Sequence, residues 1–329
     1  MTCRVVSETP SGEAMTATAT PARSSNGWSR RCSTVSNRGR TSERRGNAVT
    51  IPPPPAGTRV FAILGNPVAH SLSPAIQNAA LRAAGLDGRY VAIACQAGDV
   101  APVMRTLARA GGGGNVTVPH KRRAAAALDD AAAAVGRTGA CNTFWGEGAR
   151  ICGDNTDVEG ARRAVRTLLG GPARGARVLL AGAGGGARAA VAALIDEDAA
   201  EVRVINRTLA RAEAMAAEVG DARVRVVSDA RTPEGQAFDL VLNATSLGLG
   251  AHDPLAVDLD RLGRVGAVMD MVYAPSGTPL TDAARARGIP AMDGGEMLLR
   301  QGAAAFELWW GREAPLSAMR EALERARSA

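Results

Sequence analysis

The pattern of hydrophobic and polar positions changes near residue 57. Residues 1–56 show no apolar periodicity, are rich in Ser, Thr, Arg and Gly, and end in four prolines, Pro52–Pro55. Such a composition buries too little apolar surface to fold, so we expect a disordered basic extension that is dispensable. An organelle transit peptide and an over-called start are the alternatives.

From residue 59 onwards, short apolar runs alternate with longer alanine-rich segments. The short runs predict buried strands, and segments with an apolar stripe predict helices. We expect an α/β protein long enough for two domains. The strands are predicted at 59–64, 90–94, 115–118, 138–143, 177–181, 201–205, 240–242 and 267–272, and the helices at 75–84, 100–110, from 121, 158–169, 188–194, after 279, 297–310 and 315–326.

A glycine-rich turn marks the second half of the chain. The strand at 177–181 leads into GAGGGA, a helix and a second strand at 201–205, which is the order of a doubly wound dinucleotide-binding unit. Glycine lets the backbone approach a pyrophosphate at the helix N-terminus. The glycine spacing differs from GxGxxG, so the order of strand, turn, helix and strand supports the prediction more than the motif itself does. The predicted pyrophosphate site consists of Gly182, Ala183, Gly184, Gly185, Gly186 and Ala187.

The residues after the second strand indicate which dinucleotide binds. Asn206, Arg207 and Thr208 stand where an acid would bind the ribose 2′-hydroxyl of NAD. An arginine and two neutral polar groups suit the 2′-phosphate of NADP. A plain turn with Thr208 as helix cap is the alternative. Met271 and Tyr273 end a later strand beside the expected crevice, where they are predicted to pack on the nicotinamide; core packing is the alternative for Met271.

Polar side chains gather around Lys121, the only lysine in a chain with 38 arginines. Unlike arginine, a lysine can give up its proton when burial tunes it. On the strand before it, Asn115 and Thr117 are expected on one face, where two polar groups need a partner such as a polar ligand. Ser71 and Ser73 follow the first strand. Capping of a helix that has Pro74 at its first position explains Ser73 but not Ser71; the functional alternative is that both hydroxyls bind a polyhydroxylated or carboxylate ligand.

Asp157 ends the motif GDNTD at the start of a predicted helix. Either Asp154 or Asn155 is expected to cap this helix, which places Asp157 in the first turn. From there its carboxylate can face Lys121, and such a pair can hold a proton ready for a substrate oxygen. Gln301 is polar within an apolar helix face, so it is either solvent-exposed or a ligand contact.

Charge and cysteine usage exclude several classes of protein. The net charge is +7, but residues 1–56 carry eight arginines and three acids, so the body is nearly neutral and nucleic acid is not an expected partner. No apolar run reaches membrane-spanning length, so no membrane partner is expected. Five scattered cysteines without a CxxC motif indicate a reduced, cytoplasmic protein with no metal site.

Taken together, the motifs resemble the shikimate dehydrogenase family. They are GNPVAHSLSP (65–74), NVTVPHK (115–121), GACNT (139–143), GDNTD (153–157), GAGGGA (182–187), NRT (206–208), NATSLG (243–248), DMVY (270–273) and a final segment with a glutamine (297–302). The resemblance covers almost everything from Val60 to Gly311. It implies reversible NADPH-dependent reduction of 3-dehydroshikimate to shikimate, on the route to chorismate and aromatic amino acids.

The resemblance also implies roles and domains. Lys121 and Asp157 would be the catalytic pair. A substrate domain would contain 57–157 plus 295–329, with the last helices returning to it, and a Rossmann-type NADP domain would contain 158–294. The substrate would be held by Ser71 and Ser73 at its carboxylate, by Asn115, Thr117, Asn142 and Gln301 at its ring hydroxyls, and by Tyr273; Met271 and Gly294 would join the cofactor site.

Two positions depart from the family pattern. Val158 replaces a frequent glycine, and Gly186 replaces the usual alanine of the glycine turn. Both affect cofactor geometry at most, and neither removes a proposed catalytic group. The alternatives are a quinate/shikimate dehydrogenase using NAD, a silent NADP-binding sensor, or a nucleic-acid binder acting through the basic extension. A monomer or a homodimer fits the sequence equally.

Overall fold

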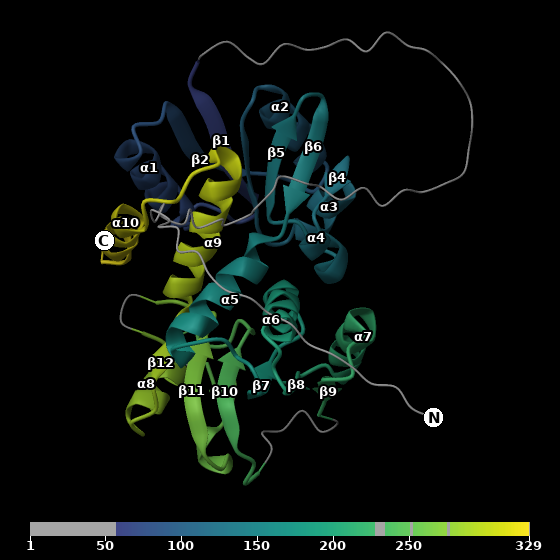
Figure 1. The fold of residues 1–329 in the computed structure, drawn as a ribbon, viewed down its shortest axis with the longest axis vertical. Coiled ribbons are helices and arrows are strands. Elements are labelled where there is room, and N and C mark those ends of the chain that lie inside the picture. The colour runs from purple at the N-terminus through teal and green to yellow at the C-terminus, as the bar shows by residue number, and fades with distance from the viewer. Residues whose placement is uncertain (1–56, 228–233, 251–252, 275–276, 329) are drawn as a thin grey trace, which may run out of the picture. The chain divides into compact units, whose positions relative to one another are not determined.

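The computed structural model describes residues 57–227, 234–250, 253–274 and 277–328, and the following description concerns these ranges. They form two six-stranded sheets with helices on their faces (Figure 1). The expected disordered extension at 1–56 lies outside the described residues. Within them, no helix combines the length and apolar character needed to cross a membrane.

The first sheet is mixed and has the strand order β2-β1-β3-β5-β6-β4. Strands β1, β2 and β3 run parallel, whereas β5 is antiparallel to β3 and forms a hairpin with β6. Asn115 on β3 therefore lies opposite Thr143 on β5. The elements are β1 (Arg59–Gly65), α1 (Ser73–Ala83), β2 (Gly88–Ala94), α2 (Val100–Arg109), β3 (Gly113–Val116), α3 (Lys121–Ala126), β4 (Asp130–Ala131), α4 (Ala133–Thr138), β5 (Thr143–Glu147) and β6 (Arg150–Asp154).

The second sheet is parallel throughout and has the order β12-β11-β10-β7-β8-β9. The winding direction reverses between β7 and β10, and such a reversal places a ligand crevice at the carboxyl ends of these strands. The predicted α/β fold with a doubly wound second sheet is confirmed. The elements are β7 (Arg177–Ala181), α6 (Gly185–Asp196), β8 (Glu201–Ile205), α7 (Leu209–Val219), β9 (Val224–Val226), β10 (Phe238–Asn243), a 3-10 turn (Leu259–Arg261), β11 (Val265–Asp270), α8 (Pro279–Arg285) and β12 (Ala291–Met292).

Two helices connect the sheets, α5 (Thr156–Leu169) and α9 (Gly294–Trp310), which lie side by side (Figure 1). Helix α9 then packs against α1 and the last helix, α10 (Leu316–Arg327). Phe306 and Trp309 of α9 are buried in one core cluster with Phe61 of β1. The C-terminal helices therefore return to the first sheet, as the resemblance implied.

Several predicted element boundaries were wrong. The strand expected at 138–143 is the end of helix α4 followed by a loop, because Gly139 takes a left-handed conformation (φ 64°) and ends the helix; the strand begins only at Thr143. Strand β3 ends at Val116, so Thr117 does not share a strand face with Asn115. Ser73 is a helical residue of α1 rather than its cap, and Leu72 occupies the cap position.

The helix after the glycine turn begins at Gly185, three residues before its predicted start at 188. Similarly, α9 begins at Gly294 rather than at 297, because the Asp293 side chain accepts a hydrogen bond from the N–H of Gly295 and caps the helix. Asn155 caps α5, as one of the two expected alternatives.

Glycine at position 160 permits the close approach of α5 and α9. A Cβ added there would lie 2.7 Å from the Cβ and 3.0 Å from the backbone nitrogen of Gln301. A Cβ on the exposed Gly136 of helix α4 would meet nothing within 4 Å. These two helical glycines therefore form a matched pair.

We expect Gly160→Ala to destabilise the protein by about 1–3 kcal/mol, because overpacking outweighs the gain in helix propensity. Gly136→Ala should instead raise the free energy of unfolding by up to about 1 kcal/mol. Urea unfolding of both variants measures the difference. Equal stabilisation of both would contradict the proposed close packing of α5 on α9.

Candidate active site

Lys121 and Asp157 form an ion pair where the first sheet meets α5. Lys121 is the first residue of α3, and its Nζ donates a hydrogen bond to Oδ2 of Asp157. The two side chains are 21% and 10% exposed. Asp157 lies in the first turn of α5, and its backbone N–H donates to the capping side chain of Asn155. The cap therefore sets the place of the carboxylate that faces Lys121.

Asn142 holds the second oxygen of Asp157. Its Nδ2 donates to Oδ1 of Asp157 at 2.8 Å and more weakly to Oε1 of Gln301 at 3.4 Å. Its Oδ1 accepts from the backbone N–H of Thr156 at 2.7 Å and from the hydroxyl of Thr143 at 2.9 Å. Because all these groups are in use, Asn142 orients Asp157 in this structure.

The Asn115 side chain is also held by hydrogen bonds through both its amide nitrogen and its oxygen. Its Nδ2 donates to the carbonyl oxygen of Asn142 at 3.1 Å and to Oγ1 of Thr143 at 2.9 Å. Its Oδ1 accepts from the hydroxyl of Tyr90 at 2.7 Å. Both amide protons are therefore used, and Asn115 retains acceptor capacity on Oδ1 for a ligand hydroxyl.

Tyr90 extends these contacts to α1. The side chain is wholly buried, and burial raises the pKa of the phenol well above 10, although a hydrogen bond from Ser73 opposes the shift. Tyr90 consequently remains neutral and keeps its proton as a donor. We name the connected residues Ser73, Tyr90, Asn115, Thr143, Thr156, Asn142, Asp157 and Lys121 the buried polar network.

The remaining predicted substrate residues lie beside this network. The hydroxyl of Ser71 accepts from the N–H of Ser73 at 3.3 Å, so Ser71, rather than Ser73, supports the start of α1. Thr117 is half-buried, with its backbone N–H bonded to the carbonyl oxygen of Leu64 at 2.8 Å. Gln301 is half-buried as well, and its Nε2 donates to Leu298 of its own helix.

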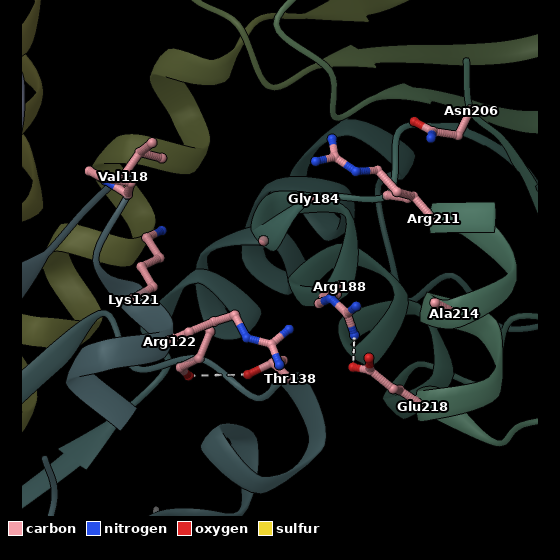
Figure 2. A pocket seen from close by; sticks show the side chains of 14 residues that line it. Val118, Lys121, Arg122, Thr138, Gly184, Arg188, Asn206, Arg211, Ala214 and Glu218 are labelled. Carbon is pink, nitrogen blue, oxygen red and sulfur yellow. Dashed lines mark hydrogen bonds and ion pairs between the residues drawn. The ribbon is translucent and has the colours of Figure 1, made fainter. Parts of the chain in front are cut away.

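A cavity of about 500 Å³ separates Lys121 from the glycine turn. Figure 2 shows Val118, Lys121 and Arg122 on one wall and Gly184, Arg188 and Arg211 on the other. The described residues that line it are Val118, Pro119, Lys121, Arg122, Thr138, Ala140, Ala183, Gly184, Gly185, Arg188, Asn206, Arg211, Ala214 and Glu218.

The glycine turn fits a dinucleotide pyrophosphate. A Cβ on Gly184 or Gly185 would meet nothing within 4 Å, so this backbone borders open space. Helix α6 has no side-chain cap and no acid in its first turn, which leaves its N-terminal N–H groups to an anion. Gly182 has φ 118° and approaches the carbonyl oxygen of Ala244 on the adjacent strand end, a position open only to glycine.

The predicted phosphate-binding residues follow the end of β8, and the first turn of α7 adds a further cation, Arg211, that the sequence did not predict. Asn206 lines the cavity, and its Nδ2 donates to the carbonyl oxygen of Thr208. Thr208 occupies the cap position of α7, but its side chain makes no capping hydrogen bond. Arg207 is exposed and is not among the lining residues. Arg211 was not predicted, although a cation in a helix's first turn opposes the macrodipole and signals a nearby anion.

Met271 lies beside the glycine turn, and Gly294 lies beside Met271. The sulfur of Met271 lies 3.1 Å from the place that a Cβ on Gly186 would take. A Cβ on Gly294 would lie 2.1 Å from the carbonyl oxygen of Met271, so glycine is needed there for α9 to approach the end of β11. Tyr273 is half-buried, which raises the pKa of its phenol, and it does not line the cavity.

Among the residues described, no group of three or more His, Cys, Asp or Glu is placed to hold a metal ion.

Models of known families match three stretches of this chain. They are the shikimate dehydrogenase substrate binding domain at residues 63–144, the shikimate / quinate 5-dehydrogenase at residues 165–248, and the shikimate 5'-dehydrogenase C-terminal domain at residues 294–324.

Individual proteins and solved structures give the same result. Shikimate dehydrogenase (NADP(+)) of Geobacter sulfurreducens is 41% identical over 277 residues, which are 81% of this chain and 96% of that protein. The enzyme of that name from Halobacterium salinarum is 44% identical over 269 residues, 80% of this chain and 98% of its own. The structure of Thermus thermophilus shikimate 5-dehydrogenase in complex with NADP(H) and shikimate matches with a TM-score of 0.72 at 38% identity, covering 81% of this chain and 99% of that one. This chain belongs to the shikimate dehydrogenase family.

Proposed function

We propose that this protein is a shikimate dehydrogenase, which reversibly reduces 3-dehydroshikimate to shikimate with NADPH. The observation that carries the proposal is the Lys121–Asp157 pair, because Lys121 lines the same cavity as the glycine turn of the doubly wound sheet. An acid–base pair and a dinucleotide cradle thus face one space. The reaction belongs to the route to chorismate and aromatic amino acids.

Bound NADPH supplies the hydride for the ketone carbon, and the chain supplies the proton. Negative charge grows on the ketone oxygen during reduction, so a preorganised donor at that oxygen lowers the barrier. Lys121 Nζ is this donor, and Asp157 holds the ammonium in place. In the reverse direction the same nitrogen receives the proton of the shikimate hydroxyl. Asn142 acts on Asp157 and so keeps Lys121 aimed at the cavity.

The other predicted residues divide into substrate and cofactor contacts. Ser71 and Ser73 bind the carboxylate, and Asn115 accepts from a ring hydroxyl through its free Oδ1 capacity. Asn142 reaches a ring hydroxyl by giving up its 3.4 Å bond to Gln301. Further substrate contacts are Thr117, Gln301 and Tyr273.

The cofactor contacts follow the second sheet. Gly182–Ala187 bind the pyrophosphate, and Asn206, Arg207, Thr208 and Arg211 bind the 2′-phosphate. Met271 and Gly294 border the nicotinamide.

Residues 57–157 plus 295–329 form the substrate domain and residues 158–294 the NADP domain, a division supported by the two separate sheets. We place the enzyme in the cytoplasm, since Cys95 and Cys141 carry free thiols, as a monomer or homodimer.

Purified protein should oxidise shikimate rapidly with NADP⁺, because no acid at the end of β8 repels the 2′-phosphate. The absorbance of the reduced nicotinamide measures turnover with shikimate or quinate, each with NADP⁺ or NAD⁺. Efficient turnover with quinate or NAD⁺ would correct the substrate or cofactor assignment. Absence of turnover in all four pairings would refute the proposal.

Lys121→Ala should lower kcat about a thousandfold with little change in the KM for shikimate, because it removes a donor needed most in the transition state. Arg123→Ala is the control, since Arg123 lies two residues further on the same helix, is exposed and does not line the cavity. A kcat of Lys121→Ala within about tenfold of the parent would rule out the catalytic role.

Thr143→Val should cost about 1–3 kcal/mol of stability, because it removes one hydrogen bond from each of the buried side chains of Asn115 and Asn142. It should also lower kcat, since Asn142 orients Asp157. Thr106→Val is the control, because among the described residues the exposed Thr106 hydroxyl bonds only the carbonyl oxygen of Pro102 on its own helix. If chemical unfolding and kcat of the two variants agree, the buried polar network does not position the catalytic pair.

A further inference from the structure

The cavity carries more positive charge than its own residues neutralise. Its described lining includes the cations Lys121, Arg122, Arg188 and Arg211 and one carboxylate, Glu218. Lys121 is paired with Asp157, and Arg188 with Glu218 (Figure 2). The guanidinium groups of Arg122 and Arg211 make no hydrogen bond or ion pair within the part of the chain that the structure describes.

The two unpaired guanidinium groups come from opposite walls. Arg211 is on α7, beside the end of β8, whereas Arg122 is on α3 and directly follows Lys121. Figure 2 shows the Arg122 side chain extending from the Lys121 wall towards the wall that carries Arg188 and the glycine turn. Arg123 is equally exposed but does not line the cavity, so Arg122 is distinguished by its position.

Like charges that share a cavity repel each other, and an anion between them removes this cost. Arginine suits a phosphate group especially well, because its planar fork can donate two parallel hydrogen bonds. The order of the cavity residues indicates which phosphate lies near Arg122. Lys121 marks the reacting end of the dinucleotide and Asn206 with Arg211 the adenosine end, so the pyrophosphate falls between them, opposite Gly184 and Gly185.

We propose that Arg122 binds the cofactor pyrophosphate from the substrate-side wall, opposite the glycine turn. The inference rests on the proposed function. The pyrophosphate would then have a contact on each wall of the cavity. Cofactor binding would draw the wall that carries Lys121 towards the wall that carries the glycine turn. Arg122 is thus a cofactor-positioning residue contributed by the substrate domain.

Isothermal titration calorimetry with two probes tests this contact without relying on turnover. NADP⁺ contains the pyrophosphate, whereas 2′-AMP retains the 2′-phosphate and lacks it. Arg122→Ala should weaken NADP⁺ about tenfold, the effect of one charge-assisted hydrogen bond, and leave 2′-AMP unchanged. Arg211→Ala should weaken both probes. Arg123→Ala, the matched control, should weaken neither, and Arg122→Lys should restore part of the NADP⁺ affinity.

Unchanged NADP⁺ affinity in Arg122→Ala would overturn the proposal, even if the parent protein oxidises shikimate. An equal loss for 2′-AMP would overturn it too, because the contact would then be to the 2′-phosphate. If the parent protein binds NADP⁺ without acting on shikimate, and Arg122→Ala still weakens NADP⁺ alone, the proposed reaction is refuted while the Arg122 contact is supported. Thermal unfolding of each variant verifies that the fold is intact, which the exposure of Arg122 leads us to expect.

Discussion

The hydrogen bonds of Asn142 are the constraint on which the site depends. This side chain joins the end of the loop after α4 to the first turn of α5 and reaches Gln301 on α9. A buried amide that lost one of these partners would leave a polar group without water or protein to bind. The geometry of the Lys121–Asp157 pair therefore depends on the positions of three separate segments: the loop after α4, the first turn of α5, and α9.

This requirement explains why the Lys121–Asp157 pair lies at a junction between elements. Lys121 begins α3 of the first sheet, while Asp157 begins α5, the helix that leads to the second sheet. Helix α9 returns from the second sheet and packs on α5 at Gly160, where the backbone of Gln301 comes close. The two sheets are thus connected through α5, which carries Asp157, and α9, whose Gln301 accepts a hydrogen bond from Asn142.

Charged side chains are paired in the buried polar network and partly unpaired in the cavity. Within the buried polar network, the charge of Lys121 is met by Asp157, whose carboxylate also receives the Asn142 amide. In the cavity, by contrast, the guanidinium groups of Arg122 and Arg211 have no protein partner among the described residues. In the proposed reaction, the first arrangement keeps the proton donor Lys121 in place before substrate arrives. The second leaves positive charge available for a phosphate-bearing ligand, and our Arg122 proposal follows from that difference.

Local patterns in the sequence determined the elements whose signals are short-ranged. Strands 177–181 and 201–205, the turn between them and the Asn155 cap depend on neighbouring residues, so their order and chemistry were predictable. The lone lysine and the Asp157 position also pointed to an acid–base pair. Tertiary structure decided what depends on distant partners: the bonds of Tyr90 and Thr143 to Asn115, and the place of Arg122 and Arg211 on one cavity. Sequence spacing does not encode these contacts, because each arises only when segments far apart in the chain pack together.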